Sequence, residues 1–314
     1  MSGVQPRQLT IPSARYGRYT LRARVGEGGM AEVFRAEVVD GAGELSTVAL
    51  KLLKRDAPSQ IAALFDFEAD VMALLDHPNL VGRLEVGEVA GRRYLAMEDV
   101  FGGDLAQLLA AHRRGQSELP LQLALRIVLE LLQGLAYLHR ARSAGGTELG
   151  LVHGDLSPAN ILLSVDGAVK LCDFGVVTAT RVGGQAIPPG TAVGTLHYLS
   201  PEQATAAPLG PTSDLFSVGV ILHELVVGYR PFQGETEDEL LSQIRAARID
   251  LPAALVDARL ARILRRALSP SPKDRHATAG ELAGELLRFQ LDAGLQCTAA
   301  QLGDHLVELL GVAG

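Results

Sequence analysis

The sequence is poor in cysteine and in aromatic side chains. It has two cysteines, no tryptophan and an aromatic fraction of 4% in 314 residues. Cys172 and Cys297 form no CxxC pair and match no zinc-ligand spacing, so neither a disulfide framework nor a cysteine metal site is expected. A low cysteine content is also typical of a reducing compartment, and we therefore expect a cytoplasmic location.

Positive charge and long hydrophobic runs are scarce as well. The net charge is −7, and no tract rich in lysine and arginine interleaves with aromatic residues, which argues against nucleic acid as a partner. Residues 1–8 lack the apolar core of a signal peptide. No uncharged apolar run reaches the roughly 18 residues that cross a membrane, so no membrane segment is expected. The hydrophobic fraction of 47% is sufficient for one large or two small packed domains.

The most informative stretch spans residues 153–160 and reads His-Gly-Asp-Leu-Ser-Pro-Ala-Asn. An Asp-Phe-Gly triplet follows at 173–175. Between them, residues 161–165 and 168–172 read as two short apolar strands, and Asp-Gly at 166–167 is typical of a hairpin turn. A hairpin brings its two ends together. The residue before the first strand and the residue after the second are therefore expected to be neighbours in space.

These two neighbours are Asn160 and Asp173. An amide oxygen and a carboxylate are hard oxygen ligands of the kind that Mg²⁺ binds. Asp155 precedes both on the incoming loop, where its carboxylate can accept a proton. The three residues together indicate a site for a metal-bound triphosphate.

A glycine-rich segment lies near the N-terminus. Residues 26–31 read Gly-Glu-Gly-Gly-Met-Ala, a pattern that by itself also matches a dinucleotide-binding turn. Such a turn must open a helix, whereas residues 19–25 before it and 33–39 after it both read as strands. The segment is therefore predicted to be a strand-turn-strand flap. Its backbone N–H groups can approach phosphates closely because glycine has no side chain.

One lysine and one glutamate form a candidate pair. Lys51 lies on a predicted strand at 48–51 and would by itself be read as a solvated edge charge. Glu68 lies in a segment at 65–75 with apolar residues at helical spacing, which His-Pro-Asn at 77–79 ends. Glu68 alone would be read as an ordinary surface residue. The presence of both Lys51 and Glu68 indicates that the helix glutamate positions the strand lysine.

These segments, in this order, resemble the eukaryotic-like protein kinases, a family to which many bacterial Ser/Thr kinases belong. The resemblance implies an α+β, bilobal protein-kinase fold. A small antiparallel β-sheet N-lobe carries helix C, and the larger C-lobe is mainly α-helical. The expected organisation is a flexible leader (1–16), a kinase domain (17–290) divided into an N-lobe (17–100) and a C-lobe (101–290), and an amphipathic helical tail (291–314).

The resemblance also implies a role for each motif residue. Lys51, held by Glu68, grips the α- and β-phosphates of ATP, and Asp155 accepts or orients the proton of the acceptor hydroxyl. Asn160 and Asp173 hold Mg²⁺, with Mn²⁺ as an alternative. The expected catalytic residues are Lys51, Glu68, Asp155, Asn160 and Thr195, the last of which braces Asp155.

Nucleotide contacts follow from the same resemblance. Met97 takes the gatekeeper position, and backbone groups of Glu98 and Val100 meet the adenine edge. Asp104 lies where the family contacts the ribose, and its position at a helix N-terminus is an equally good explanation of this residue. The expected cofactor-binding residues are Gly26, Glu27, Gly28, Gly29, Met30, Ala31, Val33, Ala49, Lys51, Met97, Glu98, Val100, Asp104, Leu162 and Asp173.

Residues 193–203 resemble the end of a Ser/Thr-kinase activation segment. In the family, Glu202 pairs with Arg275. Asp214, near the start of a long apolar helix at 213–225, holds the catalytic loop. These features favour protein substrates with Ser or Thr acceptors, the chain itself among them, over tyrosine acceptors and over small-molecule phosphotransfer.

Two positions depart from the family pattern. Gly154 stands where the family has an arginine that pairs with a phosphate on the activation segment, so we expect activity to depend weakly on phosphorylation there. Ser157 stands where the family has a lysine, and losing one such preorganised donor costs on the order of 10²–10³ in rate. We expect a slow ATP-dependent serine/threonine protein kinase of intracellular signalling. The alternative is a pseudokinase, an ATP-binding scaffold with little or no phosphotransfer.

The tail carries four leucines at helical spacing, and the sequence leaves their partner open. Docking of this helix on its own helical lobe is one interpretation. A partner or dimer surface is the other. The leucines are Leu302, Leu306, Leu309 and Leu310.

Overall fold

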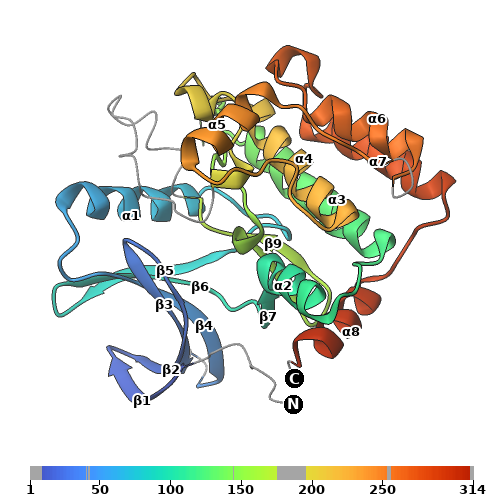
Figure 1. Cartoon of the computed structure of the whole chain (residues 1–314). Coiled ribbons are helices and arrows are strands. Elements are labelled where there is room, and N and C mark those ends of the chain that lie inside the picture. Colours follow the sequence, from blue (N-terminus) through green and yellow to red (C-terminus); the bar gives the residue numbers. More distant parts are fainter. Residues whose placement is uncertain are drawn as a thin grey trace. The chain divides into compact units, whose positions relative to one another are not determined.

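The computed structural model describes residues 9–39, 41, 43–143, 145–174, 196–252 and 256–311, with the backbone alone for 9–13. The chain divides into two compact units (Figure 1). Unit 1 is Met1–Phe101 and unit 2 is Gly102–Gly314, so the boundary falls one residue from the expected division between 100 and 101.

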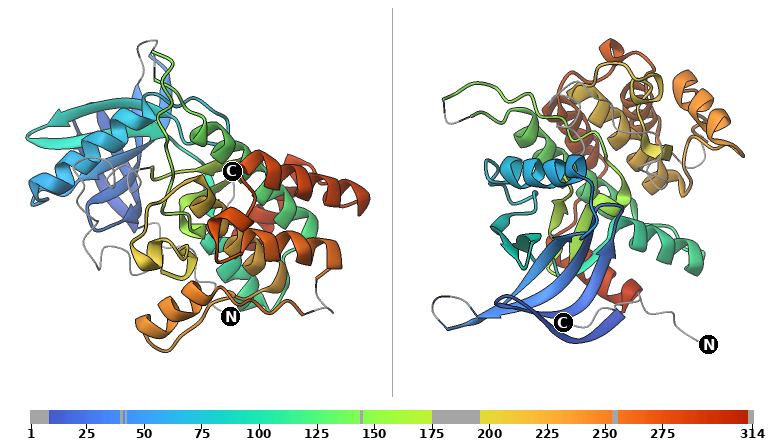
Figure 2. Two further views of the ribbon diagram at one scale, coloured as in Figure 1. Left: turned by 90° about the horizontal axis from the view of Figure 1, so that it is seen from above. Right: turned by 90° about the vertical axis from the view of Figure 1, so that its left-hand side faces the viewer.

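Unit 1 is a six-stranded antiparallel sheet with one helix. The strand order is β1-β2-β3-β4-β6-β5. Helix α1 lies along one face of this sheet (Figures 1 and 2), where the Arg83 guanidinium donates to the Ala69 carbonyl at 3.2 Å. The elements are β1 (Leu9–Tyr16), β2 (Tyr19–Glu27), β3 (Ala31–Val39), β4 (Leu45–Leu53), α1 (Ser59–Met72), β5 (Arg83–Val89) and β6 (Arg92–Glu98).

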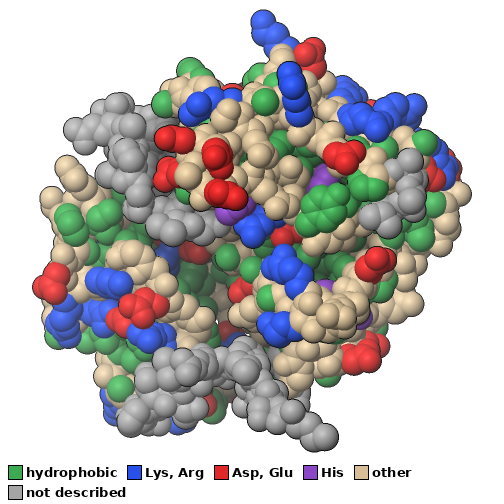
Figure 3. Space-filling view, viewed as in Figure 1, with side chains coloured by type: hydrophobic (Ala, Val, Ile, Leu, Met, Phe, Trp, Pro, Cys, Tyr) green, Lys and Arg blue, Asp and Glu red, His purple; other side chains and the backbone are tan. Residues whose placement is uncertain are grey.

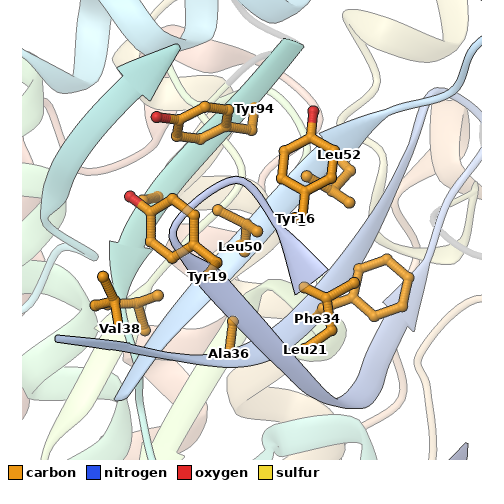
Figure 4. Packing of buried hydrophobic residues seen from close by; sticks show 11 residues of the cluster. Tyr16, Tyr19, Leu21, Phe34, Ala36, Val38, Leu50, Leu52 and Tyr94 are labelled. Atoms are coloured by element: carbon orange, nitrogen blue, oxygen red, sulfur yellow. The ribbon is translucent and has the colours of Figure 1, made fainter. Parts of the chain in front are cut away.

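A hydrophobic cluster fills the other face of this sheet (Figure 4). Three tyrosines pack edge to face within it, with ring centroids 5.9 Å apart for Tyr16 and Tyr94 and 5.4 Å apart for Tyr19 and Tyr94. Such pairs contribute stability beyond the area that they bury. The cluster consists of Tyr16, Tyr19, Leu21, Phe34, Ala36, Val38, Val48, Leu50, Leu52, Tyr94 and Ala96.

The expectation of a flexible leader over residues 1–16 is wrong for residues 9–16. These residues form β1, which pairs antiparallel with β2. Tyr16 at the end of β1 is buried, and its hydroxyl donates to the carbonyl of Arg92. Burial of this ring against β6 explains why the segment is ordered, because an aromatic side chain that leaves water supplies a large part of the free energy that ordering a strand requires.

The described residues of unit 2 form seven α-helices, four short 3₁₀ helices and a small three-stranded sheet of order β7-β8-β9. The elements are β7 (Gly102–Asp104), α2 (Leu105–Gly115), α3 (Leu121–His139), β8 (Ile161–Ser164), β9 (Val169–Leu171), α4 (Pro211–Val227), α5 (Glu237–Ala246), α6 (Ala258–Ala267), α7 (Ala279–Asp292) and α8 (Ala299–Leu310).

Helices α3 and α4 form the centre of unit 2. Almost every residue of α4 is buried, and α3 packs against α4, α7 and β9. Among the described residues, α3 is the one helix that is long and apolar enough to cross a membrane, with a mean hydropathy of 1.4 and 56% of that window buried. The core helix of a globular domain passes the same test, and α3 carries an ion pair between Arg126 and Glu130.

The tail helix docks on its own unit. Helix α8 packs against α2, β7 and β8, and Leu302 and Leu306 are fully buried there. The contact is close. A Cβ atom on Gly303 would lie 2.0 Å from the carbonyl oxygen of Val165, so only glycine fits at this position. The interpretation that the tail docks on its own helical lobe is confirmed.

Candidate active site

Unit 1 brings Lys51 and Glu68 into direct contact. Lys51 lies on β4, and its Nζ donates to Oε1 of Glu68 on α1 at 2.7 Å and to Oε2 at 2.8 Å. Both residues are buried, with 6% of Lys51 and 1% of Glu68 exposed. A buried charge without a partner is strongly unfavourable, so each residue holds the other in place. The predicted pair is confirmed.

The strand register places four predicted nucleotide-binding residues on one face of the sheet. Residues directly opposite one another on antiparallel strands share a face. Val33 on β3 is opposite Lys51, and Ala49 on β4 is opposite Met97 on β6. Ala49 and Lys51 are two residues apart, so all four share the face that α1 covers, whereas the tyrosine cluster occupies the other face.

The glycine-rich segment is a turn between paired strands. Strand β2 ends at Glu27 and β3 begins at Ala31, which leaves residues 28–30 as the turn. The N–H of Gly28 donates to the carbonyl of Ala31 at 2.9 Å, and a Cβ atom on Gly29 would meet no atom within 4 Å. The strand-turn-strand prediction is confirmed, and a dinucleotide-binding turn is excluded because no helix follows.

The remaining predicted nucleotide residues of unit 1 lie at the ends of strands. Gly26 is the residue before the last in β2 and lies opposite Val33. Met30 is the last residue of the glycine-rich turn. Glu98 ends β6, and its carboxylate accepts the N–H of Gly82 at 2.7 Å. Val100 is the residue before the last in unit 1. Contacts of their backbone groups with adenine and phosphates stay predictions.

The catalytic loop of unit 2 is held from α4. Asp214 accepts two backbone N–H groups, from His153 at Oδ2 and from Gly154 at Oδ1, both at 2.8 Å. His139, at the end of α3, lies 2.7 Å from Oδ2 through its Nε2. Asp214 is 1% exposed, and such a buried carboxylate requires donors of this kind. The predicted role of Asp214 is confirmed. His139 was not predicted, since a single histidine at a helix end carries no motif.

The ring of His153 connects the catalytic loop with the end of the β8–β9 hairpin. The N–H of Asp155 donates to Nδ1 of His153 at 3.2 Å, so the proton of the neutral ring lies on Nε2. Nε2 in turn donates to the carbonyl of Cys172 at 3.0 Å. The ring is 1% exposed and packs edge to face on Phe174. One side chain therefore connects the backbone of Asp155 with the residue before Asp173.

Asn160 makes a direct contact with Asp155. The short 3₁₀ turn at Pro158–Asn160 brings Nδ2 of Asn160 to 2.7 Å from the carbonyl oxygen of Asp155 and to 3.2 Å from its carboxylate Oδ2. Because the amide nitrogen makes both hydrogen bonds, Oδ1 is the amide atom that is available to a cation.

The hairpin places Asn160 beside Cys172, the residue before Asp173, and a shared metal site of Asn160 and Asp173 stays a prediction. Strands β8 and β9 pair antiparallel, and the N–H of Cys172 donates to the carbonyl of Asn160 at 3.0 Å. The turn has three residues, 165–167, with Gly167 at φ +78°. A three-residue loop that ends in a left-handed glycine is a common hairpin connection.

The backbone of Asp173 is strained. Its φ is +60°, a left-handed conformation that costs a residue other than glycine about 1–3 kcal/mol and persists only where the surroundings fix it. Together with Oδ1 of Asn160, its carboxylate is a hard oxygen donor set that fits Mg²⁺. Among the described residues, no group of three or more His, Cys, Asp or Glu side chains could hold a metal ion.

Asp104 and Leu162 lie directly opposite each other on β7 and β8. Oδ1 of Asp104 accepts the N–H of Gln107 at 2.8 Å, which makes Asp104 the N-cap of α2. Burial raises the pKa of the Asp104 carboxyl. The helix-terminus explanation of Asp104 is confirmed, and the ribose contact stays a prediction.

Gly154 is well suited to its place in the catalytic loop. Its φ is +72°, which glycine adopts without strain. Its carbonyl accepts Nε2 of Gln203 at 2.6 Å, and Oε1 of Gln203 accepts the N–H of Ser200 at 2.9 Å. Gln203 thus ties the catalytic loop to the segment around Ser200. Gln203 had no predicted role, because its only signal in the sequence is its place after Ser-Pro-Glu.

Glu202 and Arg275 form the predicted ion pair. Two parallel hydrogen bonds of 2.8 Å join the guanidinium to the carboxylate, and the Arg275 side chain is completely buried. The pair is confirmed. Thr195, predicted to brace Asp155, lies outside the described residues, as does Gly175.

Sequence similarity to known proteins covers both units. The protein kinase domain model matches residues 19–302 and so continues past the expected domain end at 290. Tyrosine-protein kinase MasK of Myxococcus xanthus is 31% identical over 306 residues, which cover 91% of this chain and 46% of MasK. Serine/threonine-protein kinase PknL of Mycobacterium tuberculosis is 34% identical over 275 residues (86% of this chain, 65% of PknL). Serine/threonine-protein kinase pkn3 of Myxococcus xanthus is 35% identical over 289 residues (86% of this chain, 49% of pkn3).

The chain therefore spans less than two thirds of the length of each of these three relatives. The match to the domain model, by contrast, includes the Lys51–Glu68 pair, the catalytic loop and the metal-site hairpin. This chain belongs to the protein kinase family, with bacterial protein kinases among its homologues.

Proposed function

We propose that this chain is an ATP-dependent serine/threonine protein kinase that acts in cytoplasmic signalling. It transfers the γ-phosphoryl group of ATP to Ser or Thr hydroxyls of proteins, the chain itself among them. The observation that carries the proposal is the orientation of Asn160, whose amide nitrogen contacts the proton acceptor Asp155 while its amide oxygen is available to a cation. Neither Cys172 nor Cys297 forms a disulfide among the described residues, which is consistent with a reducing compartment.

The residues of this chain position the reactants. Lys51, fixed by Glu68, holds the α- and β-phosphates, and Asp155 accepts or orients the proton of the attacking hydroxyl. His153 and Asp214 fix the backbone around Asp155. Mg²⁺, when bound by Asn160 and Asp173, neutralises charge on the phosphates. Positioning and electrostatic stabilisation account for most of the catalysis of phosphoryl transfer.

Ser157 makes the proposed enzyme slow. Ser157 is 4% exposed and cannot supply the positive charge of the family lysine. We expect a rate on the order of 10²–10³ below that of a kinase with the lysine. Ser157 and Gly154 are also the observations that favour the second candidate, a pseudokinase that binds ATP without transferring phosphate.

The test is transfer of labelled γ-phosphate from Mg-ATP to the purified chain and to a generic basic acceptor protein. Asp155→Asn should abolish incorporation. Asp166→Asn makes the same chemical change at the exposed turn of the β8–β9 hairpin and should leave incorporation unchanged. No incorporation above that of Asp155→Asn, in folded protein that binds ATP, would move the assignment to the pseudokinase.

The acceptor residue type requires its own measurement. PknL and pkn3 are named serine/threonine-protein kinases and MasK is named a tyrosine-protein kinase, so the names of the relatives support both types. Acid hydrolysis of the labelled protein followed by separation of phosphoamino acids distinguishes them. We expect phosphoserine and phosphothreonine, and label in phosphotyrosine alone contradicts the Ser/Thr assignment.

A further inference from the structure

A polar cavity of about 160 Å³ lies beside the catalytic loop, entirely within unit 2. Residues 157–159 of the catalytic loop form one wall. Its charged lining residues are Arg113 at the end of α2, Glu224 on α4 and Arg230 after α4, and Ala106, Leu109 and Tyr198 complete the lining. Arginine and lysine side chains gather over α2 on the face shown in Figure 3.

The single carboxylate in the cavity already has partners. Oε1 of Glu224 accepts Nη1 of Arg113 at 2.9 Å, and Nε of Arg230 lies 3.9 Å from the same oxygen. Oε2 accepts the hydroxyl of Tyr198 at 2.5 Å. Glu224 is 1% exposed. A basic ligand would have to displace an arginine to reach this buried carboxylate, which makes cation binding unfavourable.

The two arginines, by contrast, are open to a ligand. The side chains of Arg113 and Arg230 are 50% and 36% exposed. Within the part of the chain that the structure describes, Arg113 uses one of its five N–H donors, on Glu224. Two guanidinium groups and one carboxylate leave a net charge of +1 in the cavity. Its accessible surface therefore presents cationic N–H donors, which suit a carboxylate.

The cavity also lies at the distance from Asp155 that an acceptor peptide requires. Ser157 in its wall is two residues from Asp155, so the two Cα atoms are at most about 7.6 Å apart. An extended peptide advances about 3.3 Å per residue. A side chain two or three residues from the acceptor hydroxyl can thus reach the cavity while the hydroxyl lies at Asp155.

We propose that this cavity binds a carboxylate side chain of the acceptor protein, two or three residues from the phosphorylated Ser or Thr, through Arg113 and Arg230. The proposal rests on the proposed kinase function and adds a substrate preference to it. The preferred substrates are proteins with an acidic residue close to the acceptor.

The experiment uses serine peptides with Glu, Gln or Lys at each position within three residues of the acceptor. At one of these positions we expect Glu to lower KM about tenfold relative to Gln, and Lys to raise it. Arg113→Ala should remove the preference for Glu. Arg114→Ala, at the neighbouring exposed position outside the cavity, should retain it. Glu224→Gln keeps an acceptor for Tyr198, raises the net charge to +2 and should increase the preference.

The opposite effects of Arg113→Ala and Glu224→Gln separate charge recognition from a loss of folding. Equal KM values for the Glu and Gln peptides, or a preference for Lys, overturn the proposal while leaving the kinase function in place. If no peptide is phosphorylated, the kinase function fails. Fluorescence anisotropy of labelled peptides with Ala at the acceptor position then tests separately whether the cavity binds the acidic side chain. Tighter binding of the Glu peptide that requires Arg113 supports the proposal, and equal binding overturns it.

Discussion

Asp214 holds Gly154 in a left-handed backbone conformation. Its Oδ1 accepts the N–H of Gly154 at 2.8 Å, and φ of Gly154 is +72°. Residue 154 is where the family carries an arginine. In this chain the glycine satisfies the backbone geometry without strain, and the side chain of Gln203 bonds its carbonyl.

Gly154→Ala should lower the free energy of unfolding by about 1–2 kcal/mol, because a Cβ atom is unfavourable at this φ. Urea denaturation measures the change. The control is Gly284→Ala in α7, where an added Cβ meets no atom within 4 Å and the substitution should stabilise the helix slightly. Equal effects of the two substitutions would contradict the role of the backbone conformation.

Removing either member of the buried Lys51–Glu68 pair should cost about 3–5 kcal/mol, since the other charge stays buried and loses this ion pair. The double variant Lys51→Met/Glu68→Leu should cost less than the sum of the single variants. Arg93→Met is the matched control, because its ion pair with Asp66 also joins the sheet to α1 but is 40–48% exposed. Its loss should cost less than about 1 kcal/mol. Additive costs for the double variant would show that the two charges are independent.

Phosphorylation of the activation segment should have little effect on activity. Gly154 has no side chain to bind a phosphate on a threonine of the activation segment such as Thr191, which lies outside the described residues. Thr191→Ala should keep phosphotransfer within about threefold of the unsubstituted chain, because the charge-assisted contact that a phosphate would gain is missing. Asp155→Asn serves as the inactive reference. Loss of activity in Thr191→Ala would show that another group on the chain replaces the missing arginine.

Leu306→Ala in the tail helix should lower the free energy of unfolding by about 2–5 kcal/mol, because Leu306 is completely buried between α8 and the rest of unit 2. Val307→Ala, at a neighbouring position that is 38% exposed, should change it by less than about 0.5 kcal/mol. Thermal or urea unfolding of the full chain gives both values. A small effect of Leu306→Ala would mean that α8 is not docked in solution.

The stability of the chain should fall in mild acid because of a histidine pair between α2 and α8. Nε2 of His112 lies 3.0 Å from Nε2 of His305. Burial lowers the pKa of His112, and the nearby His305 lowers it further. Burial also lowers the pKa of His305, although Glu308 opposes that shift. The unfolded chain, with histidine pKa values near about 6.5, therefore binds more protons than the folded chain.

The sign of the effect follows from this difference. The contribution of the pair is fully present above about pH 6.5 and is lost as the pH falls from there toward the lower pKa values of the folded state. His305→Gln should therefore reduce the drop in unfolding free energy between pH 7.5 and 5.5. Part of the drop should remain, because burial also lowers the pKa values of His197, His223 and His276. Val307→Ala should keep the slope of the unsubstituted chain.

Local sequence patterns predicted the parts of the site that depend on near neighbours. The prediction of the β8–β9 hairpin required only two apolar strands and an Asp-Gly pair in the turn between them. The hairpin places Asn160 beside the residues that lead to Asp173. The glycine-rich flap was likewise distinguished from a dinucleotide-binding turn by the strands on either side of it. The Lys51–Glu68 contact followed from a strand and a helix close in sequence together with the family resemblance.

Contacts between distant segments could not be predicted in this way. His139 reaches Asp214 across 75 residues, and Gln203 reaches Gly154 across 49, yet neither histidine nor glutamine stands in a pattern that identifies its partner. The cavity between Arg113 and Arg230 is a further example, since its charge depends on which side chains the fold brings around Glu224.

The sequence by itself determined the kinase family, the antiparallel N-terminal sheet, the helical remainder and the identity of the proposed reacting residues. Periodicity and short motifs are properties of a few consecutive residues, and the chain carries them whether folded or not. Only the tertiary structure decided that residues 9–16 form a strand, that α8 belongs to unit 2, and that Gln203 and His139 support the catalytic loop. Each of these depends on burial and hydrogen bonding between segments far apart in the chain, which arise when the core closes around them.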